Sequence, residues 1–169
     1  MRTFTLWLEN RQPYVYHVTF YKNLDLISDE GLDYKEYGGA NFSQGVYPIH
    51  SMSGNFFTTD INRISFWIHS LEYSGLDQSD NIEEDGLIPI ILRFRLNPKK
   101  YQPDIHGGDP SDHFTDRLIP PQGLQVWDGK QWMPILNWNN INLDDFVDRD
   151  EYGASVKDRY PMPKNEAQL

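Results

Sequence analysis

Short runs of aromatic and β-branched residues, separated by turn-forming segments, are the feature that most limits the folds open to this chain. The clearest run is residues 14–20, Tyr-Val-Tyr-His-Val-Thr-Phe, a composition typical of a β-strand. In residues 90–96 apolar side chains alternate with two arginines, which is the period of a strand whose side chains face opposite ways. The pair Asp128-Gly129 between two strand-like runs predicts a β-hairpin. The strands that we expect are residues 14–20, 56–59, 87–96, 123–127 and 130–135.

Two segments have the residue spacing of helices. Residues 23–31 begin at Asn23, which can cap a helix, and end at Gly31, which can stop one. A second helix follows Asp60, whose carboxylate can accept hydrogen bonds from the first free amides. Its apolar positions are Ile61, Ile64, Ile68 and Leu71, with Trp67 alongside. Because strands outnumber helices, we predict an α+β fold with an antiparallel or mixed sheet.

The length of 169 residues suits one domain that buries its own core. We expect a single domain over residues 1–140. An acidic C-terminal extension over residues 141–169 follows it, and we expect that extension to fray from Tyr160 on. The segments expected as loops are residues 34–55, 76–86 and 97–117.

Charge and cysteine content exclude several classes of protein. The chain has 25 acidic and 15 basic residues, a formal net charge of −10, which argues against a general affinity for nucleic acid or anionic membranes. It has no cysteine, so it has no disulfide scaffold, thiolate metal site or cysteine nucleophile. The apolar run at the N-terminus is broken too soon for a signal peptide, and no run approaches the length of a membrane span. We therefore expect a cytoplasmic protein, and delivery by a leaderless route is compatible with this sequence.

Four pieces of sequence, in a fixed order, carry a family resemblance. They are Tyr16-His17-Val18-Thr19 with Asn23-Leu24, Ile27 and Gly31-Leu32; Gly54-Asn55-Phe56-Phe57-Thr58-Thr59-Asp60; Pro89-Ile90-Ile91-Leu92-Arg93-Phe94-Arg95; and Ile119-Pro120-Pro121-Gln122-Gly123-Leu124 with Trp132-Met133-Pro134-Ile135. This succession resembles the ADP-ribosyltransferase-like superfamily, and most closely its small bacterial toxin-type and effector members. The resemblance spans roughly residues 14 to 136, and its opening piece is the most specific part.

The resemblance implies a split central sheet with NAD⁺ bound between its halves. It also implies an enzyme that cleaves the nicotinamide–ribose bond and transfers ADP-ribose to a protein or nucleic acid. His17 matches the histidine that, with the neighbouring backbone, holds the nicotinamide-side ribose in this family. The further NAD-binding residues implied are Val18, Thr19, Gly31, Phe56, Phe57 and Thr58. An immunity or antitoxin protein is an implied partner, and a membrane is not.

The aromatic position of the family pattern departs from the usual residue. The family has a tyrosine where this chain has Phe56, with Phe57 next to it. A phenylalanine ring can still stack on nicotinamide, but it lacks the phenol hydrogen bond. Tyr47 is an alternative source of a tyrosine. If the two phenylalanines alternate in a short strand, one faces the core and the other faces the ligand.

The third position of the family pattern is a carboxylate, commonly a glutamate about seven residues before an Ile-Pro-Pro turn. Counting back from Ile119 gives Asp112, with Asp116 as the fallback and Gln122 or Gln125 as remoter options. Cleavage of the nicotinamide–ribose bond builds positive charge on the ribose, as glycoside hydrolysis does. A fixed carboxylate stabilises that charge and can orient the incoming nucleophile. We therefore expect His17, Phe56 and Asp112 to act as the catalytic residues.

Other charged groups have alternative interpretations. Arg63, Arg93 and Arg95 are candidates to balance the charge of a diphosphate, but we favour solvated positions for all three. The segment from Asp104 to His113 contains potential metal ligands, and we favour a solvated acidic loop there because their spacing is irregular.

Three further functions are compatible with the sequence. The fold could have lost its chemistry and act as a nucleotide- or protein-binding module, because two positions depart from the family pattern. An NAD glycohydrolase and an RNA 2′-phosphotransferase are related alternatives, and the second is disfavoured by the net charge of −10.

Overall fold

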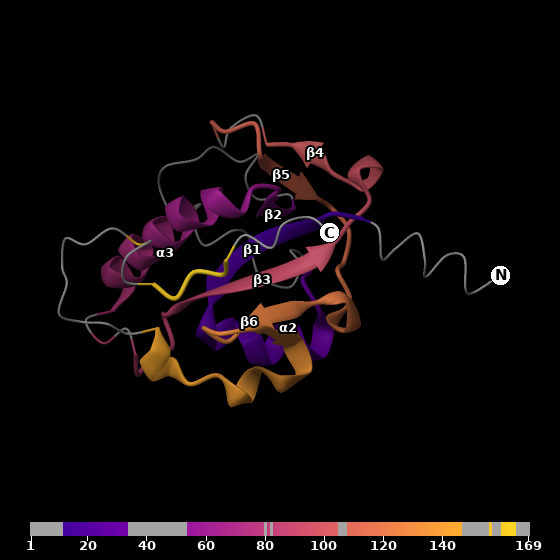
Figure 1. The fold of residues 1–169 in the computed structure, drawn as a ribbon. Coiled ribbons are helices and arrows are strands. Elements are labelled where there is room, and N and C mark those ends of the chain that lie inside the picture. Colours follow the sequence, from indigo (N-terminus) through magenta and orange to yellow (C-terminus); the bar gives the residue numbers. More distant parts are fainter. Residues whose placement is uncertain are drawn as a thin grey trace.

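Seven short strands form one sheet in the order β4-β5-β2-β1-β3-β6-β7, and every neighbouring pair is antiparallel (Figure 1). The structure is a computed structural model, and it describes residues 12–33, 54–79, 81, 83–104, 108–146, 156 and 160–164. The strands are β1 (Tyr14–Phe20), β2 (Asn55–Thr58), β3 (Pro89–Arg95), β4 (Gln102–Pro103), β5 (Asp112–Thr115), β6 (Gln125–Trp127) and β7 (Trp132–Pro134). The predicted α+β class is confirmed, with an antiparallel sheet.

Two α-helices and six 3-10 helices accompany the sheet within the described residues. The α-helices are α2 (Leu24–Glu30) and α3 (Ile64–Gln78). The 3-10 helices are η1 (Tyr21–Asn23), η3 (Ile61–Arg63), η4 (Pro98–Lys100), η5 (Pro121–Gly123), η6 (Ile135–Asn140) and η7 (Leu143–Asp145). None of the helices in this part of the chain is long and apolar enough to cross a membrane.

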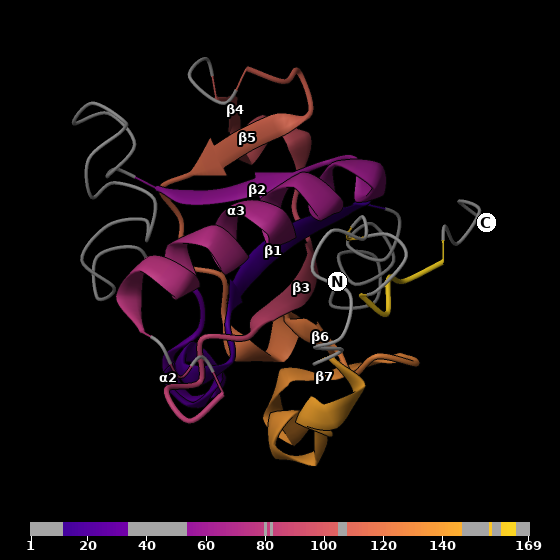
Figure 2. The same ribbon diagram turned by 90° about the vertical axis from the view of Figure 1, so that its left-hand side faces the viewer.

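Helix α3 lies across one face of the sheet, in front of β1 and β2 in Figure 2. Its buried side includes Ile64, Ile68 and Leu71, which recur at the expected helical spacing. Asp60 caps the preceding turn as predicted, because its carboxylate accepts a hydrogen bond from the Asn62 amide at 2.9 Å. The helix continues to Gln78, so the prediction of a loop from residue 76 is wrong for its first residues.

Helix α2 ends at the predicted residue, but it does not begin with the predicted cap. Gly31 ends the helix with φ of +86°, a conformation that suits glycine. A side chain there is also blocked, since an added Cβ would lie 2.2 Å from the Ile119 carbonyl oxygen. Asn23 does not cap the helix, because the chain is already helical there: it is the last residue of the 3-10 turn η1, and its amide nitrogen donates to Thr19 Oγ1 at 3.0 Å.

Strand β3, which lies between β1 and β6 inside the sheet, is buried on both faces, which the alternating sequence did not indicate. Ile90, Ile91 and Leu92 are all fully buried. Arg93, expected to be solvated, is buried between the rings of Tyr14 and Trp132, with its Cζ 4.1 and 4.3 Å from their centroids. The solvated position predicted for Arg93 is therefore wrong, because aromatic residues of other strands cover its guanidinium.

Arg95 has a similar aromatic neighbour. Its Cζ lies 4.0 Å from the Tyr14 ring centroid, and it also donates to the Gln12 carbonyl, so it is not simply solvated.

The predicted hairpin is confirmed, and the predicted loop over residues 97–117 is wrong. Residues 128–131 connect β6 to β7, the Asp128 amide donates to the Gln131 carbonyl at 3.1 Å across the turn, and Gly129 has a positive φ of 98°. In contrast, residues 97–117 contain η4, β4 and β5. Strand β5 has only four residues and pairs with β2, which lies more than fifty residues earlier in the sequence.

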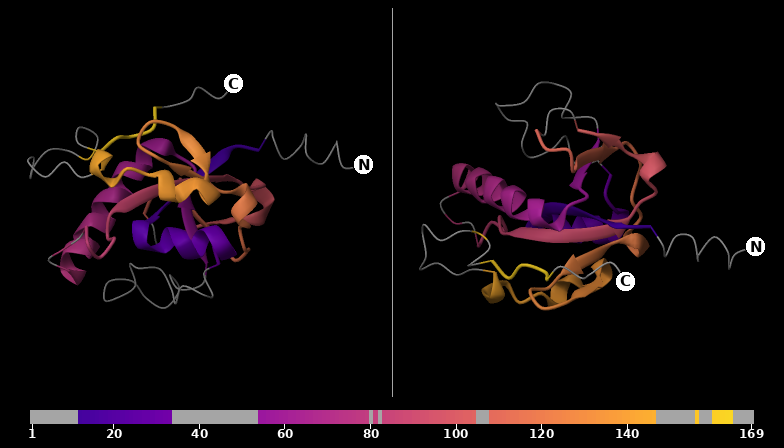
Figure 3. Two further views of the ribbon diagram at one scale, coloured as in Figure 1. Left: turned by 90° about the horizontal axis from the view of Figure 1, so that it is seen from below. Right: turned by 45° about the horizontal axis from the view of Figure 1, so that its top comes forward.

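Several of the described residues beyond 140 pack against the same core as the rest of the chain. Phe146 and Tyr160 are buried and contact each other edge to face at 5.4 Å between centroids. The Tyr160 hydroxyl donates to the Pro89 carbonyl at 2.8 Å, and residues 160–164, drawn in yellow, run beside β3 (Figure 3). Tyr160, which we expected in a frayed end, is thus part of the core.

Candidate functional site

The pairing between β1 and β2 is interrupted after a single register position. Strand β1 pairs with β3 along all seven of its residues, but it pairs with β2 only at Tyr16 and Thr58. Beyond that point the His17 side chain spans the two strands, with Nδ1 2.6 Å from the Phe56 carbonyl oxygen. We call this the β1–β2 interruption. At this point the His17 side chain, rather than a backbone hydrogen bond, connects β1 to β2. It therefore joins the β4-β5-β2 part of the sheet to the rest.

His17 is held in one protonation form by its surroundings. Burial lowers the pKa of His17, and the hydrogen bond to the Phe56 carbonyl opposes that effect only in part. The imidazole is therefore neutral near pH 7. Because a carbonyl oxygen can only accept, Nδ1 must carry the proton, and Nε2 is left as a hydrogen-bond acceptor.

The two phenylalanines of β2 face opposite sides of the sheet. Phe57 is buried and makes edge-to-face contacts with Phe94 and Tyr101 at 5.7 and 5.1 Å between centroids. Phe56 is half-buried and lies 5.9 Å from the Phe114 ring on the other face. Phe57 therefore lies on the face of the sheet opposite α3, and Phe56 lies on the face that α3 covers, as strand alternation requires.

Asp112 begins β5 and pairs in register with Thr58 of β2. Its carboxylate is 2% exposed, and both of its oxygens are hydrogen-bonded. The Trp67 indole donates to Oδ1 at 3.1 Å, and Arg63 donates to Oδ2 through Nη2 at 3.2 Å and Nε at 3.4 Å. Burial raises the pKa of Asp112, while the bonds from Trp67 and the charge of Arg63 oppose the rise.

Arg63 is thus an ion-pair partner, and the prediction of a solvated Arg63 is wrong. Its Cζ also lies 3.7 Å above the ring centroid of Phe66, one turn further along the helix. The sequence could not indicate this pairing, because Arg63 and Asp112 are 49 residues apart and meet only when β5 pairs with β2.

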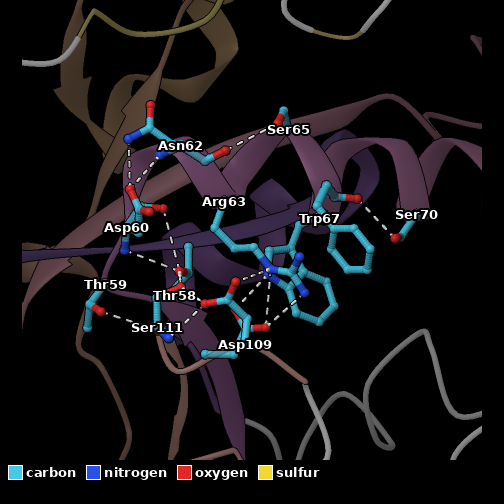
Figure 4. A network of polar contacts seen from close by, with 12 residues as sticks. Thr58, Thr59, Asp60, Asn62, Arg63, Ser65, Trp67, Ser70, Asp109 and Ser111 are labelled. Carbon is cyan, nitrogen blue, oxygen red and sulfur yellow. Dashed lines mark hydrogen bonds and ion pairs between the residues drawn. The ribbon is translucent and has the colours of Figure 1, made fainter.

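A second carboxylate, Asp109, lies beside the same arginine (Figure 4). Its Oδ1 accepts hydrogen bonds from the Ser111 amide at 2.9 Å and the Ser111 hydroxyl at 2.6 Å, and its Oδ2 lies 3.8 Å from Arg63 Nε. Those two bonds, followed by the charge of Arg63, lower the pKa of Asp109. Ser111 in turn accepts a hydrogen bond from the Thr58 hydroxyl at 3.1 Å, so the network reaches β2.

The predicted residues therefore gather on three adjacent strands but divide between two faces. His17 of β1 and Phe57 of β2 lie on one face, with Phe94. Phe56, Thr58 and Asp112 lie on the α3 face, where Val18 is also buried. The two groups meet only at the β1–β2 interruption, where the His17 ring contacts the backbone of Phe56.

The remaining predicted residues lie further along β1 or in other parts of the chain. Thr19 is buried and accepts the hydrogen bond from Asn23. Gly31 ends α2, where its close approach to Ile119 accounts for the glycine. Asp116 is exposed, Gln122 is exposed in η5, and the Gln125 side chain accepts from Arg93 Nε at 2.7 Å. Tyr47 and His106 lie outside the described residues, as do residues 34–53, most of the segment expected to be a loop.

The structure places two further side chains at this site that the sequence did not single out for it, Trp67 and His113, and it gives Arg63, a candidate diphosphate partner in the sequence, a carboxylate partner instead. Arg63 and Trp67 hold Asp112, and His113 stacks at 14° on the Phe57 ring while its Nδ1 lies 2.8 Å from the Ser111 carbonyl oxygen. Trp67 could be noticed in the sequence only as a large residue beside the apolar helix positions. The described residues contain no group of three or more histidine, aspartate or glutamate side chains placed to bind a metal ion.

No protein-family model, curated protein or solved structure matches this chain.

Proposed function

We propose that this protein is an NAD⁺-dependent ADP-ribosyltransferase of the bacterial toxin or effector type. The observation that carries the proposal is the neutral His17 imidazole at the β1–β2 interruption, with Nδ1 bonded to Phe56 and Nε2 left as an acceptor. A ribose hydroxyl is a hydrogen-bond donor that such an acceptor can hold. The opening sequence Tyr16-His17-Val18-Thr19, which carries the family resemblance, is the strand on which that imidazole stands.

The strand order also supports the proposal. The resemblance implies a split sheet with a histidine, an aromatic residue and a carboxylate on three strands. Here His17, Phe56 and Asp112 come from β1, β2 and β5, which are neighbours in the sheet. The His17 side chain lies on the face opposite to Phe56 and Asp112, so NAD⁺ would have to reach across the β1–β2 interruption to contact all three. The interruption between β1 and β2 is where a split would open.

The proposed reaction breaks the bond between the nicotinamide nitrogen and C1′ of the ribose, and nicotinamide leaves as a neutral molecule. A nucleophile on a protein or nucleic acid then forms the new bond to C1′ and gives up its proton. Positive charge on the ribose is greatest between these events, and the carboxylate of Asp112 is the group proposed to stabilise it. His17 holds the ribose, and Phe56 supplies an aromatic face for nicotinamide.

The test is release of nicotinamide from millimolar NAD⁺, first in buffer and then with cell lysate as the source of acceptor. We expect release by the wild type and its loss in His17→Ala and in Asp112→Asn. Trp127→Phe is the matched control, because it removes an indole hydrogen bond to the Pro161 carbonyl, far along the sheet. Release that needs lysate indicates transfer, and release in buffer that yields free ADP-ribose indicates hydrolysis. Folded wild-type protein that releases no nicotinamide under either condition contradicts the proposal.

A second candidate function is favoured by one specific observation. Both oxygens of Asp112 are already hydrogen-bonded and the side chain is 2% exposed, as expected for a carboxylate that only holds β5 to α3. In that case the chain is an ADP-ribosyltransferase-like fold that binds a nucleotide or a protein without chemistry. NAD⁺ binding by calorimetry without nicotinamide release, lost in His17→Ala, is the result that supports nucleotide binding.

A further inference from the structure

The carboxylate of Asp112 is enclosed by donors from a single stretch of chain, the end of η3 and the start of α3. Trp67 donates to one carboxylate oxygen at 3.1 Å, and Arg63 donates to the other at 3.2 and 3.4 Å. Each oxygen therefore has its own donor side chain, which fixes both the position of the carboxylate and the rotation of its plane.

The two donors are themselves fixed by packing. The Arg63 guanidinium stacks on the Phe66 ring at 3.7 Å, and the Phe66 and Trp67 rings meet edge to face at 5.3 Å between centroids. This contact explains why a phenylalanine that is 43% exposed occurs on the outer side of α3. The Asp60 cap holds the turn from which Arg63 projects. The donors are therefore carried by a rigid element rather than by a loop.

Opposing effects act on the pKa of Asp112, and burial, the largest of them, raises it. Burial disfavours the ionised form, whereas Trp67 and Arg63 favour it. Asp109 is the other charged group that faces Asp112, and its negative charge adds to the effect of burial. Removing one donor should therefore shift the ionisation of Asp112 measurably.

We propose that Trp67 and Arg63 are positioning residues for Asp112, each fixing one carboxylate oxygen so that the group is ionised and oriented when NAD⁺ is cleaved. This inference rests on the proposed function. A carboxylate one methylene shorter than the glutamate common in the family reaches less far, so it depends more on being held in place.

The experiment compares the wild type with Trp67→Phe and the control Trp127→Phe by carbon NMR of the labelled aspartate carboxyls. We expect the titration midpoint of Asp112 to rise by about one pH unit in Trp67→Phe, a tenfold change in its ionisation constant. We expect no change in Trp127→Phe. The acidic limb of the pH profile for nicotinamide release should move upward by the same amount in Trp67→Phe alone.

Arg63→Lys is the second variant, used whether or not Trp67→Phe folds. It keeps the charge but loses the two-nitrogen contact with Oδ2, so we expect kcat to fall more than tenfold with KM for NAD⁺ changed less than threefold. If the wild type is active but neither the Asp112 titration midpoint nor the acidic limb of the pH profile moves in Trp67→Phe, the positioning role is overturned. The proposed function is not affected by that result. If the wild type releases no nicotinamide, the proposed function is overturned. Trp67 and Arg63 then position Asp112 for the fold and not for catalysis.

Discussion

Removing the cation from the Arg63–Asp112 pair should be the most damaging single change at this site. In Arg63→Met the Asp112 carboxylate stays buried at 2% exposure and keeps only the Trp67 donor. Removing one partner of a buried ion pair costs about 3–5 kcal/mol. We expect the lower end, about 3 kcal/mol, because the Arg63 side chain is 19% exposed and water can replace part of its contribution.

The loss of stability caused by Arg63→Met should decrease as the pH falls. Burial raises the pKa of Asp112 in the folded protein, so ionisation of this group weakens the fold as the pH rises through that value. Loss of Arg63 raises the pKa further, because it removes a charge and hydrogen bonds that lower it. The destabilisation by Arg63→Met should therefore be full at pH 7 and fade as the pH falls and Asp112 becomes protonated.

Thermal and urea unfolding at pH 7 and at acidic pH provide the measurement. For a chain of this length about 3 kcal/mol corresponds to a fall in Tm of roughly 6–12 °C at pH 7. Adding Asp112→Asn removes the buried charge, so we expect the double variant to be more stable than Arg63→Met alone. Lys130→Met is the control, because its partner Asp145 forms an exposed pair at 3.0 Å worth about 0–1 kcal/mol. A cost that is independent of pH and is not relieved by Asp112→Asn refutes the reasoning.

Three further predictions concern other parts of the account. NAD⁺ affinity, measured by calorimetry, should be constant from pH 8 to about 6.5 and should fall only at lower pH. The reason is that burial lowers the pKa of His17, and protonation would turn the Nε2 acceptor into a donor; a midpoint above 6.5 contradicts this. Asp60→Ala should cost about 1 kcal/mol in urea unfolding through loss of the helix cap, and no measurable cost would contradict the capping role. Gly31→Ala should prevent folding or cost several-fold more than Gly108→Ala, for which about 1 kcal/mol is expected. Both glycines have positive φ, but only at Gly31 does a Cβ meet backbone, 2.2 Å from the Ile119 oxygen; equal costs would refute this explanation.

The sequence predicted best those elements whose signals are local. Strand β1 was predicted with its observed bounds, because seven consecutive aromatic and β-branched residues have few alternatives. The Asp60 cap and the turn at Asp128 and Gly129 were predicted for the same reason, since each depends on a few adjacent residues. Asn23 failed as a cap because the chain is already helical at that residue: η1 continues directly into α2.

The parts that could not be predicted depend on distant pairing. Strand β5 has four residues, among them an aspartate and a histidine, and it exists because β2 offers a register for it. That register brings Asp112 to Trp67 and Arg63, 45 and 49 residues away in the sequence. Without the pairing of β5 with β2, Arg63 is only an arginine on a helix and Asp112 only an aspartate after a glycine- and proline-rich segment. Both are then expected to be solvated. His17 could be singled out, but its contact with Phe56 could not.

The most direct measurement of the central claim is the NMR spectrum of the His17 imidazole during titration with NAD⁺. If a ribose hydroxyl binds at the β1–β2 interruption, the Nε2 resonance of His17 should shift while Nδ1, bonded to Phe56, changes little. His69 is the internal reference, because it is exposed on α3. We predict a saturable shift at His17 and none at His69. Unchanged His17 resonances at millimolar NAD⁺, in folded protein, would contradict the account.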